Sequence, residues 1–322
     1  MRRRSRMPEI KRAIVTGATG MLGIATTERL LREGYEVVAV ARPSSARLCN
    51  IPSDDRITVV ELALDDISYL PSDLKEEGID HADLFFHFAW DGTYGDSRND
   101  VDIQLNNIRN SVDAVRAAAE LGCSCFLGAG SQAEYGRVPD GTKLSCDTPC
   151  DPENGYGMAK LAAGRLTRLE AGKLGIKHIW VRILSTFGPY DGAQTMVMSG
   201  IAKMAEGQKA SYTRGEQMWD YLYCKDAAKA FYLAATLGRN NSVYPVGSGS
   251  VRPLREYITA IRDAVDPSLD IGFGEVDYYP GQVMYLCADI SKLQEDTGFA
   301  PDYTFEEAIK ETVKWYKEEN KK

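Results

Sequence analysis

Ser131, Tyr156 and Lys160 are three residues whose types and spacing suit the transfer of a proton. Tyr156 and Lys160 belong to the stretch YGMAK and lie four residues apart, so a helix would place both side chains on one face. A free tyrosine has a pKa of roughly 10, and a neighbouring ammonium would favour its phenolate. Ser131 ends an apolar run, where its hydroxyl can polarise a substrate oxygen. We therefore predict that these three residues are catalytic.

Three glycines in AIVTGATGMLG, namely Gly17, Gly20 and Gly23, follow a short apolar run and precede a helix-length segment. In this context the pattern indicates a dinucleotide site. The first glycine would permit a tight turn, the second a close approach to a pyrophosphate, and the third close packing of helix on strand. The loop residues that we expect to contact the cofactor are Gly17, Thr19, Gly20, Met21 and Leu22.

The end of the second expected strand indicates which dinucleotide binds. A site selective for NAD usually has an acidic residue there, but this sequence has Ala41 followed by Arg42. An arginine can bind the 2′-phosphate of NADP with two hydrogen bonds, and Ser45 offers a hydroxyl donor nearby. We therefore expect Arg42 and Ser45 to contact the cofactor, with NADP(H) preferred and NAD(H) as the alternative.

Composition argues against several other classes of protein. The chain has 322 residues, of which 44% are hydrophobic, and a net charge of −8, so we expect a globular protein that binds no nucleic acid. No apolar run reaches the roughly 18 residues of a membrane span. The basic opening MRRRSRMP leads into charged residues, and we interpret residues 1–7 as an extension rather than a signal peptide. The seven cysteines and three histidines lack zinc-ligand spacing, which predicts free thiols, no metal site and a cytoplasmic protein.

Short apolar runs alternate with helix-length segments over more than half of the chain. The runs expected to be strands are RAIVTGA, EVVAVAR, RITVVEL, ADLFFHFAW, CSCFLGAGS and KHIWVRIL. This alternation predicts an α/β fold, a Rossmann-type doubly wound parallel sheet. From about residue 187, glycine, proline and aromatic residues interrupt shorter elements such as YPVGSGSVRP, which predicts a smaller C-terminal α/β domain for the substrate.

We expect WDYLYCKDAAKAFYLAATLG to return to the main sheet as a strand and a helix. The predicted cofactor domain therefore comprises residues 8–186 and about 219–245. The predicted substrate-binding domain comprises about 187–218 and 246–322.

The motifs appear in an order that resembles the extended short-chain dehydrogenase/reductase family, which contains sugar-nucleotide epimerases, dehydratases and reductases. The resemblance covers nearly the whole chain and rests on TGATGMLG, HFAW, LNNIRNS, GSQAEYG, YGMAK, VRILSTFGP, GEQMWDYLYCKDAAKA and ADISKLQEDTGFAP. It implies that Tyr156 is the acid/base, that Lys160 binds the cofactor ribose and that Ser131 polarises the substrate.

The resemblance also implies further contacts. For the cofactor these are Asp66, Ala89, Asn107 and Thr186, besides Lys160. For the substrate they are Trp90, Ser131, Ser185, Arg214 and Trp219. The acid expected near the adenine falls at Asp66 in one register, whereas another register places Ala63 and Leu64 there.

Departures from the family narrow the expected reaction. Its 4,6-dehydratases carry an Asp-Glu pair directly after the catalytic hydroxyl residue, where this chain has Gln132 and Ala133, so dehydration is not expected. Its combined epimerase-reductases use a cysteine near this turn and a histidine after GP, where this chain has Ala133 and Tyr190. Two reactions remain, NADP(H)-dependent reduction of a nucleotide-linked 4-keto deoxysugar and NAD-dependent C4 epimerisation, and we expect the reduction.

Two other hypotheses concern regulation and assembly. A regulator that senses NAD(P) without chemistry would be expected to lose Tyr156 or Lys160, and both are present. The resemblance implies a homodimer built from the helices in VDIQLNNIRNSVDAVRAAAEL and YGMAKLAAGRLTRLEAGKLG. Ala162, Ala163, Leu166 and Leu169 are available for that contact, or for the core alone.

Overall fold

The computed structural model describes residues 11–320, so the predicted extension at residues 1–7 lies outside the described residues. Its main feature is a seven-stranded sheet with the order β11-β6-β5-β4-β1-β2-β3, in which every pair of neighbours is parallel. The strands are β1 (Arg12–Thr16), β2 (Glu36–Ala41), β3 (Ile57–Glu61), β4 (Leu84–His87), β5 (Cys125–Ser131), β6 (Lys177–Ile183) and β11 (Ser242–Val246). The predicted doubly wound parallel sheet is confirmed, and the first six strands fall in the six predicted runs.

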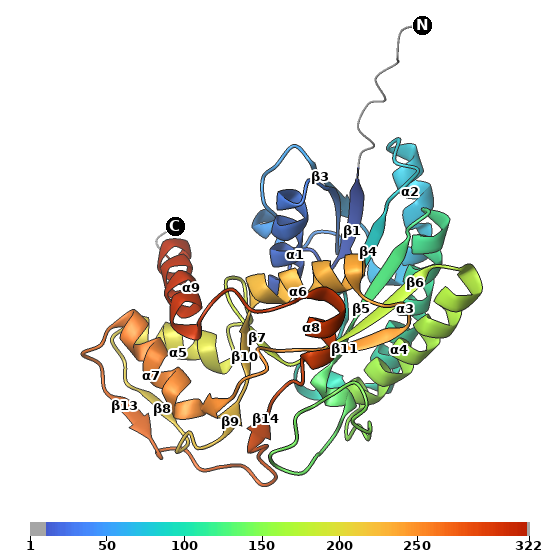
Figure 1. Ribbon diagram of the computed structural model, residues 1–322. Coiled ribbons are helices and arrows are strands. Elements are labelled where there is room, and N and C mark those ends of the chain that lie inside the picture. The colour runs from blue at the N-terminus through green and yellow to red at the C-terminus, as the bar shows by residue number, and fades with distance from the viewer. Residues whose placement is uncertain (1–10, 321–322) are drawn as a thin grey trace, which may run out of the picture.

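Helices cover both faces of this sheet (Figure 1). One face carries α1 (Met21–Arg32) and α6 (Cys224–Leu237), and the other carries α2 (Leu70–Glu76), α3 (Val101–Glu120) and α4 (Gly155–Leu174). Buried apolar side chains form a separate cluster on each side, with Leu30 and Phe231 in one and Leu74 and Val115 in the other. Strands covered on both faces explain why the strand sequences are continuous apolar runs rather than alternating ones.

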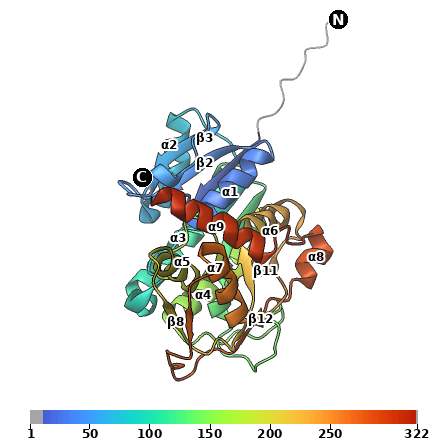
Figure 2. The same cartoon turned by 90° about the vertical axis from the view of Figure 1, so that its left-hand side faces the viewer.

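A smaller body of short elements packs beside the sheet, lower left in Figure 1. Its helices are α5 (Met196–Ala205), α7 (Leu254–Val265) and α9 (Phe305–Glu319). Its strands form three small sheets: β7 (Ser185–Phe187) with β10 (Tyr221–Tyr223), β8 (Ala210–Tyr212) with β13 (Ile271–Phe273), and β9 (Met218–Trp219) between β12 (Arg252–Pro253) and β14 (Tyr285–Leu286). In Figure 2, α9 crosses the face of the molecule with α1 above it and α5 and α7 below. Ala25 of α1 shares a buried cluster with Ile201, Ile261 and Ile309, so this body packs directly on α1.

The far end of the chain differs from the sequence-based expectations in three places. Strand β10 pairs with β7 in a separate ribbon and does not return to the main sheet, although α6 behind it does cover the sheet. The seventh sheet strand is β11, which contains the first residues of YPVGSGSVRP, a stretch in which the sequence predicted no strand of the main sheet. Pro245 is tolerated there because β11 is an edge strand with β6 as its single partner, so the missing N–H costs no ladder bond. Helix α8 (Ser291–Thr297) packs against α6 and β11, although it lies in the range expected for the substrate domain.

Four 3₁₀ segments complete the described chain. They are η1 (Leu48–Asn50), η2 (Leu64–Tyr69), η3 (Gly95–Asn99) and η4 (Gln132–Glu134). No helix within residues 11–320 is long and apolar enough to cross a bilayer. The same residues contain no group of three side chains suited to hold a metal ion.

Candidate active site

The structure brings Ser131, Tyr156 and Lys160 together at the carboxyl edge of the sheet. Ser131 is the last residue of β5, and helix α4 begins just before Tyr156 because the Asn154 side chain accepts a hydrogen bond from the Gly157 N–H at 2.9 Å. Burial raises the pKa of Tyr156, and a hydrogen bond with Ser131 opposes that shift. The catalytic tyrosine and serine predicted from the sequence are therefore within contact of each other.

Lys160 lies one helical turn beyond Tyr156 and is almost fully buried, 3% exposed. Its ammonium donates to the carbonyl oxygen of Ala129 at 2.7 Å and lies 3.6 Å from the centroid of the Trp90 ring. Burial lowers the pKa of Lys160 to about 7, and the Glu134 carboxylate acts in the opposite direction. With this pKa, the Lys160 amine can change its charge near neutral pH. Its nitrogen lies 5.8 Å from the centre of the Tyr156 ring.

Glu134 is a buried residue of this site that our sequence reasoning did not identify. Its Oε1 accepts hydrogen bonds from the Ser131 N–H and the Trp180 indole N–H, both at 2.9 Å. Its Oε2 accepts one from Arg182 Nε at 2.8 Å. The Glu134 carboxylate therefore links the main chain of Ser131 to a buried cation on β6. The signal was present, because Arg182 interrupts the apolar run KHIWVRIL, and a charge in a buried strand needs a partner.

The segment after β4 forms another wall of the site. The Trp90 indole N–H donates to Gln104 Oε1 at 3.0 Å, and the amide of Asn107 bonds both the N–H and the C=O of Asp91, at 3.0 and 2.8 Å. Asn107 thus holds the loop that carries Trp90. Arg98, which our sequence analysis did not single out, lies 4.4 Å from the centroid of the Tyr156 ring.

A pocket of about 410 Å³ opens where the sheet order reverses between β1 and β4. The predicted residues that line it are Gly17, Thr19, Arg42, Ser45, Ala89 and Trp90. Of the two registers considered for the adenine end, the pocket contains Ala63 and Leu64, whereas Asp66 is exposed and is not among its lining residues.

The glycine loop has the geometry that a pyrophosphate requires. Gly17 has φ +69°, and a Cβ added there would lie 2.9 Å from the Ala89 nitrogen. A Cβ on Gly23 would lie 2.3 Å from the Gly17 carbonyl oxygen, so the third glycine allows helix and strand to pack closely. A Cβ on Gly20 would meet nothing closer than 3.6 Å, so this glycine leaves free space at the first turn of α1. These residues fit a dinucleotide.

The part of this pocket that follows β2 carries two arginines, Arg42 and Arg47. Arg42 has 76% of its side chain exposed and forms a long ion pair, 4.0 Å, with Asp91. Ser44, with φ +55°, donates its N–H to the Glu61 carboxylate at 2.7 Å. The basic side chains therefore lie in a loop whose main chain is held by an acid.

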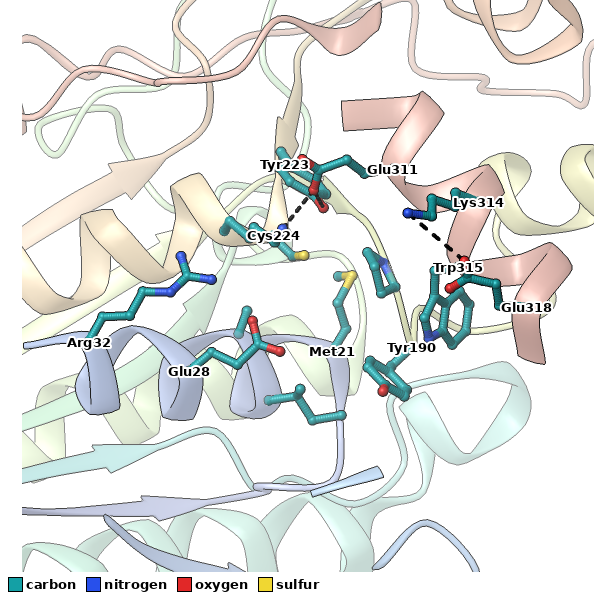
Figure 3. A pocket seen from close by; sticks show the side chains of 14 residues that line it. Met21, Glu28, Arg32, Tyr190, Tyr223, Cys224, Glu311, Lys314, Trp315 and Glu318 are labelled. Atoms are coloured by element: carbon teal, nitrogen blue, oxygen red, sulfur yellow. Dashed lines mark hydrogen bonds and ion pairs between the residues drawn. The ribbon is translucent and has the colours of Figure 1, made fainter. Parts of the chain in front are cut away.

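Met21 points elsewhere. Figure 3 shows its side chain in a different pocket, between Cys224 and Tyr190 and facing the Trp315 helix. The neighbouring Leu22 packs against the apolar core. Met21 and Leu22 are the first two residues of α1, so their main-chain N–H groups have no partner within the helix. A cofactor could contact these two residues through those N–H groups.

The predicted substrate residues are only partly brought together. Ser185 accepts a hydrogen bond from the Trp219 indole N–H at 2.8 Å, which joins β7 to β9, and Thr186 follows Ser185 in β7. Arg214 is exposed in the loop between β8 and β9. Within residues 11–320 no hydrogen bond or ion pair joins this loop to Ser131, Tyr156 or Lys160, and the substrate roles stay predictions.

The family model described as "NAD dependent epimerase/dehydratase family" matches residues 13–247. A dTDP-glucose 4,6-dehydratase of Xanthomonas campestris pv. campestris is 29% identical over 200 residues, which are 59% of this chain and 57% of that protein. The chain thus matches little more than half the length of this relative.

Two solved structures share the fold over nearly the whole chain. A UDP-N-acetylglucosamine 4-epimerase from Methanobrevibacter ruminantium M1, in complex with UDP-N-acetylmuramic acid, has a TM-score of 0.85 at 24% identity and covers 97% of this chain and 99% of its own. A dTDP-glucose 4,6-dehydratase from Bacillus anthracis, in complex with NAD, has a TM-score of 0.80 at 18% identity, with coverage of 97% and 98%.

Proposed function

Because the chain belongs to the NAD dependent epimerase/dehydratase family, we propose that it is an NADP(H)-dependent oxidoreductase that reduces the 4-keto group of a nucleotide-activated deoxyhexose. The observation that carries this proposal is the meeting of Ser131, Tyr156 and Lys160 at the edge of the sheet where the dinucleotide pocket opens. Membership of this family supports a nucleotide-sugar substrate, and the chain's own residues support the choice of reaction.

The catalytic side chains suit proton donation to a developing alkoxide. A bound nicotinamide would supply the hydride to C4. Burial raises the pKa of Tyr156, so its phenol is protonated at neutral pH and can give its proton to the substrate oxygen. Ser131 would donate a hydrogen bond to the same oxygen, and the charged form of Lys160 would stabilise the phenolate that Tyr156 leaves behind.

The turn after Ser131 argues against dehydration. Gln132 and Ala133 form the start of η4 and carry no carboxylate that could remove or deliver a proton. The acid of this turn, Glu134, is 0% exposed and its carboxylate is occupied by the Ser131 main chain, Trp180 and Arg182. The pair of acids needed to eliminate water is therefore missing.

The choice of NADP(H) is supported by the pocket that Arg42, Ser45 and Arg47 line at the end of β2, beyond the neutral Ala41. A reductase must exchange its cofactor after each turnover, whereas a C4 epimerase regenerates it in place. NAD-dependent C4 epimerisation is the second candidate, since Asp91 and Glu61 bring carboxylates to the same loop and would oppose a 2′-phosphate.

Cofactor titration separates the two candidates. Purified protein is titrated with NADPH, NADP⁺, NADH and NAD⁺, and any nucleotide that copurifies is identified by mass spectrometry. The reductase predicts an empty site on purification and tighter binding of the phosphorylated pair, with the preference lost in Arg42→Ala. Retained NAD, or equal preference in the wild type and Arg42→Ala, would favour the epimerase.

We also propose a homodimer formed through α3 and α4. Apolar side chains are exposed along both helices, Leu105 on α3 at 57% and Leu166 and Leu169 on α4 at 45% and 60%. Ala163 belongs to the core instead, with 0% exposure. An exposed apolar stripe of this kind is more typical of an interface than of a solvated surface.

A further inference from the structure

A further pocket, of about 340 Å³, lies between α4, the edge strand β11 and its neighbour β6. It shares no lining residue with the dinucleotide pocket. The lining residues that matter here are Arg165, Arg168, His178, Trp180, Arg182 and Asn241.

The pocket carries an excess of positive charge. Arg165 and Arg168 are exposed and lie three residues apart on one face of α4, and none of the ion pairs within residues 11–320 includes either of them. Arg182 is paired with Glu134, the single acid among the described lining residues. Two guanidinium groups therefore remain uncompensated in a chain whose net charge is −8.

Two buried polar atoms in the lining have no hydrogen-bond partner. One is Nη1 of Arg182, whose side chain is 7% exposed, and the other is Nδ1 of His178, which is 1% exposed. An unmet donor on a buried cation is costly, and a native protein rarely leaves one without a ligand or water. The Arg182 donor is suited to an anion.

The His178 atom is suited to the opposite partner. The hydroxyl of Thr167 has one proton, which it gives to the Ala163 carbonyl oxygen at 2.7 Å. His178 Nε2, 2.9 Å from this hydroxyl, must then carry the ring proton and donate it. Burial lowers the pKa of His178 to about 3, with Arg168 acting in the same direction, so the ring is neutral and Nδ1 is an acceptor. It needs a hydroxyl or another donor.

The two atoms lie at opposite ends of the pocket. His178 and Arg182 are four residues apart on β6, a separation of roughly 13 Å along a strand. Burial raises the pKa of Cys150, and the nearby charges of Arg182 and Arg165 both oppose this shift. Arg168 instead lowers the pKa of His178. Arg165 therefore belongs to the end that contains Arg182, and Arg168 to the end that contains His178.

From this polarity we propose that the pocket binds a small phosphate ester of a polyol, such as a hexose phosphate. The phosphate would lie at the Arg165 and Arg182 end, where the free Nη1 donates to it. The hydroxyls of the polyol would extend toward His178 Nδ1 and Asn241. The pocket shares the Glu134–Arg182 pair with the wall behind Ser131 but no lining residue with the dinucleotide pocket, and we assign it a ligand other than the cofactor and the reacting nucleotide sugar.

Isothermal titration calorimetry on the full chain, with NADPH present at saturation, tests the proposal. The probes are glucose 6-phosphate, inorganic phosphate and glucose. We expect glucose 6-phosphate to bind at one site, more tightly than inorganic phosphate, and glucose alone not to bind. Arg165→Gln should weaken binding of both phosphates by about tenfold or more, since it removes a charged hydrogen-bond donor.

Lys203→Gln is the matched control, because it removes one positive charge from an exposed position on α5, outside the pocket and away from the helices proposed for the dimer. Circular dichroism checks that each variant is folded. Equal affinity of the wild type and Arg165→Gln would overturn the proposal, as would the absence of any heat with 10 mM probe. Tighter binding of both phosphates in a titration without NADPH would also overturn it, because the phosphates would then occupy the cofactor pocket. Inorganic phosphate binding as tightly as the ester would refute the polyol end and assign the pocket to free phosphate.

Discussion

Replacing Glu134 by glutamine tests whether the buried ion pair behind Ser131 holds the site together. The side chains of Glu134 and Arg182 are 1% and 7% exposed, and their atoms approach to 2.8 Å. Glutamine keeps the volume and can still accept the hydrogen bond of the Ser131 N–H, but it leaves the guanidinium buried without its counter-charge. Removing one partner of such a pair costs about 3–5 kcal/mol, and we expect that loss in the free energy of unfolding.

Glu153→Gln provides the comparison, since Glu153 pairs with Arg137 at 2.9 Å while their side chains are 54% and 60% exposed. An exposed pair contributes less than about 1 kcal/mol. The assay is urea unfolding of the wild type and both variants, with the free energies taken from linear extrapolation. The kcat of Glu134→Gln should also fall, because Ser131 loses part of its support. If Glu134→Gln is no less stable than Glu153→Gln, our account of this network is refuted.

Three further predictions concern the catalytic pair and the dimer. Tyr156→Phe should lower turnover by about 10²–10⁴-fold without changing the Kd of NADPH. A regulator that only senses NAD(P) would instead behave the same with and without this substitution. The pKa of Lys160 is about 7 when folded and higher when unfolded, so the unfolded state binds more protons above pH 7 and the wild type gains stability as pH rises. Urea unfolding at pH 7 and pH 9 should show this gain, up to about 1.4 kcal/mol per pH unit, and Lys160→Met should lack it; equal slopes would contradict the burial of a titrating amine. Leu166→Glu combined with Leu169→Glu should convert a dimer to a monomer in sedimentation velocity, and an unchanged sedimentation coefficient would remove α4 from the interface.

Local patterns in the sequence predicted most of the fold. The apolar runs identified six strands of the main sheet, and the glycine spacing identified the turn at Gly17, whose positive φ and close approach to Ala89 require a glycine. The spacing of Tyr156 and Lys160 correctly placed both on one helix face. These features depend on residues that are neighbours in sequence, so their chemistry is readable before folding.

Contacts between distant segments were harder to predict. Glu134 and Arg182 are 48 residues apart, and only the fold places β5 and β6 side by side so that the two side chains meet. The edge strand β11 was missed because Pro245 and nearby glycines suggested a loop, whereas an edge position tolerates a proline. Two registers were considered for the residue near the adenine of the cofactor, and one of them gave Asp66. Asp66 lies within η2 and is not among the residues that line the pocket.

The most direct test of the proposed reaction follows deuterium. The protein is incubated with a nucleotide-linked 4-keto-6-deoxyhexose and NADPH that carries deuterium at both positions of nicotinamide C4. Our account predicts one NADPH oxidised per sugar reduced, with one deuterium at C4 of the product and none when Tyr156→Phe replaces the wild type. A parallel incubation with a 4-hydroxy nucleotide sugar that yields its C4 epimer without consuming NADPH or acquiring label would contradict the account and establish the epimerase.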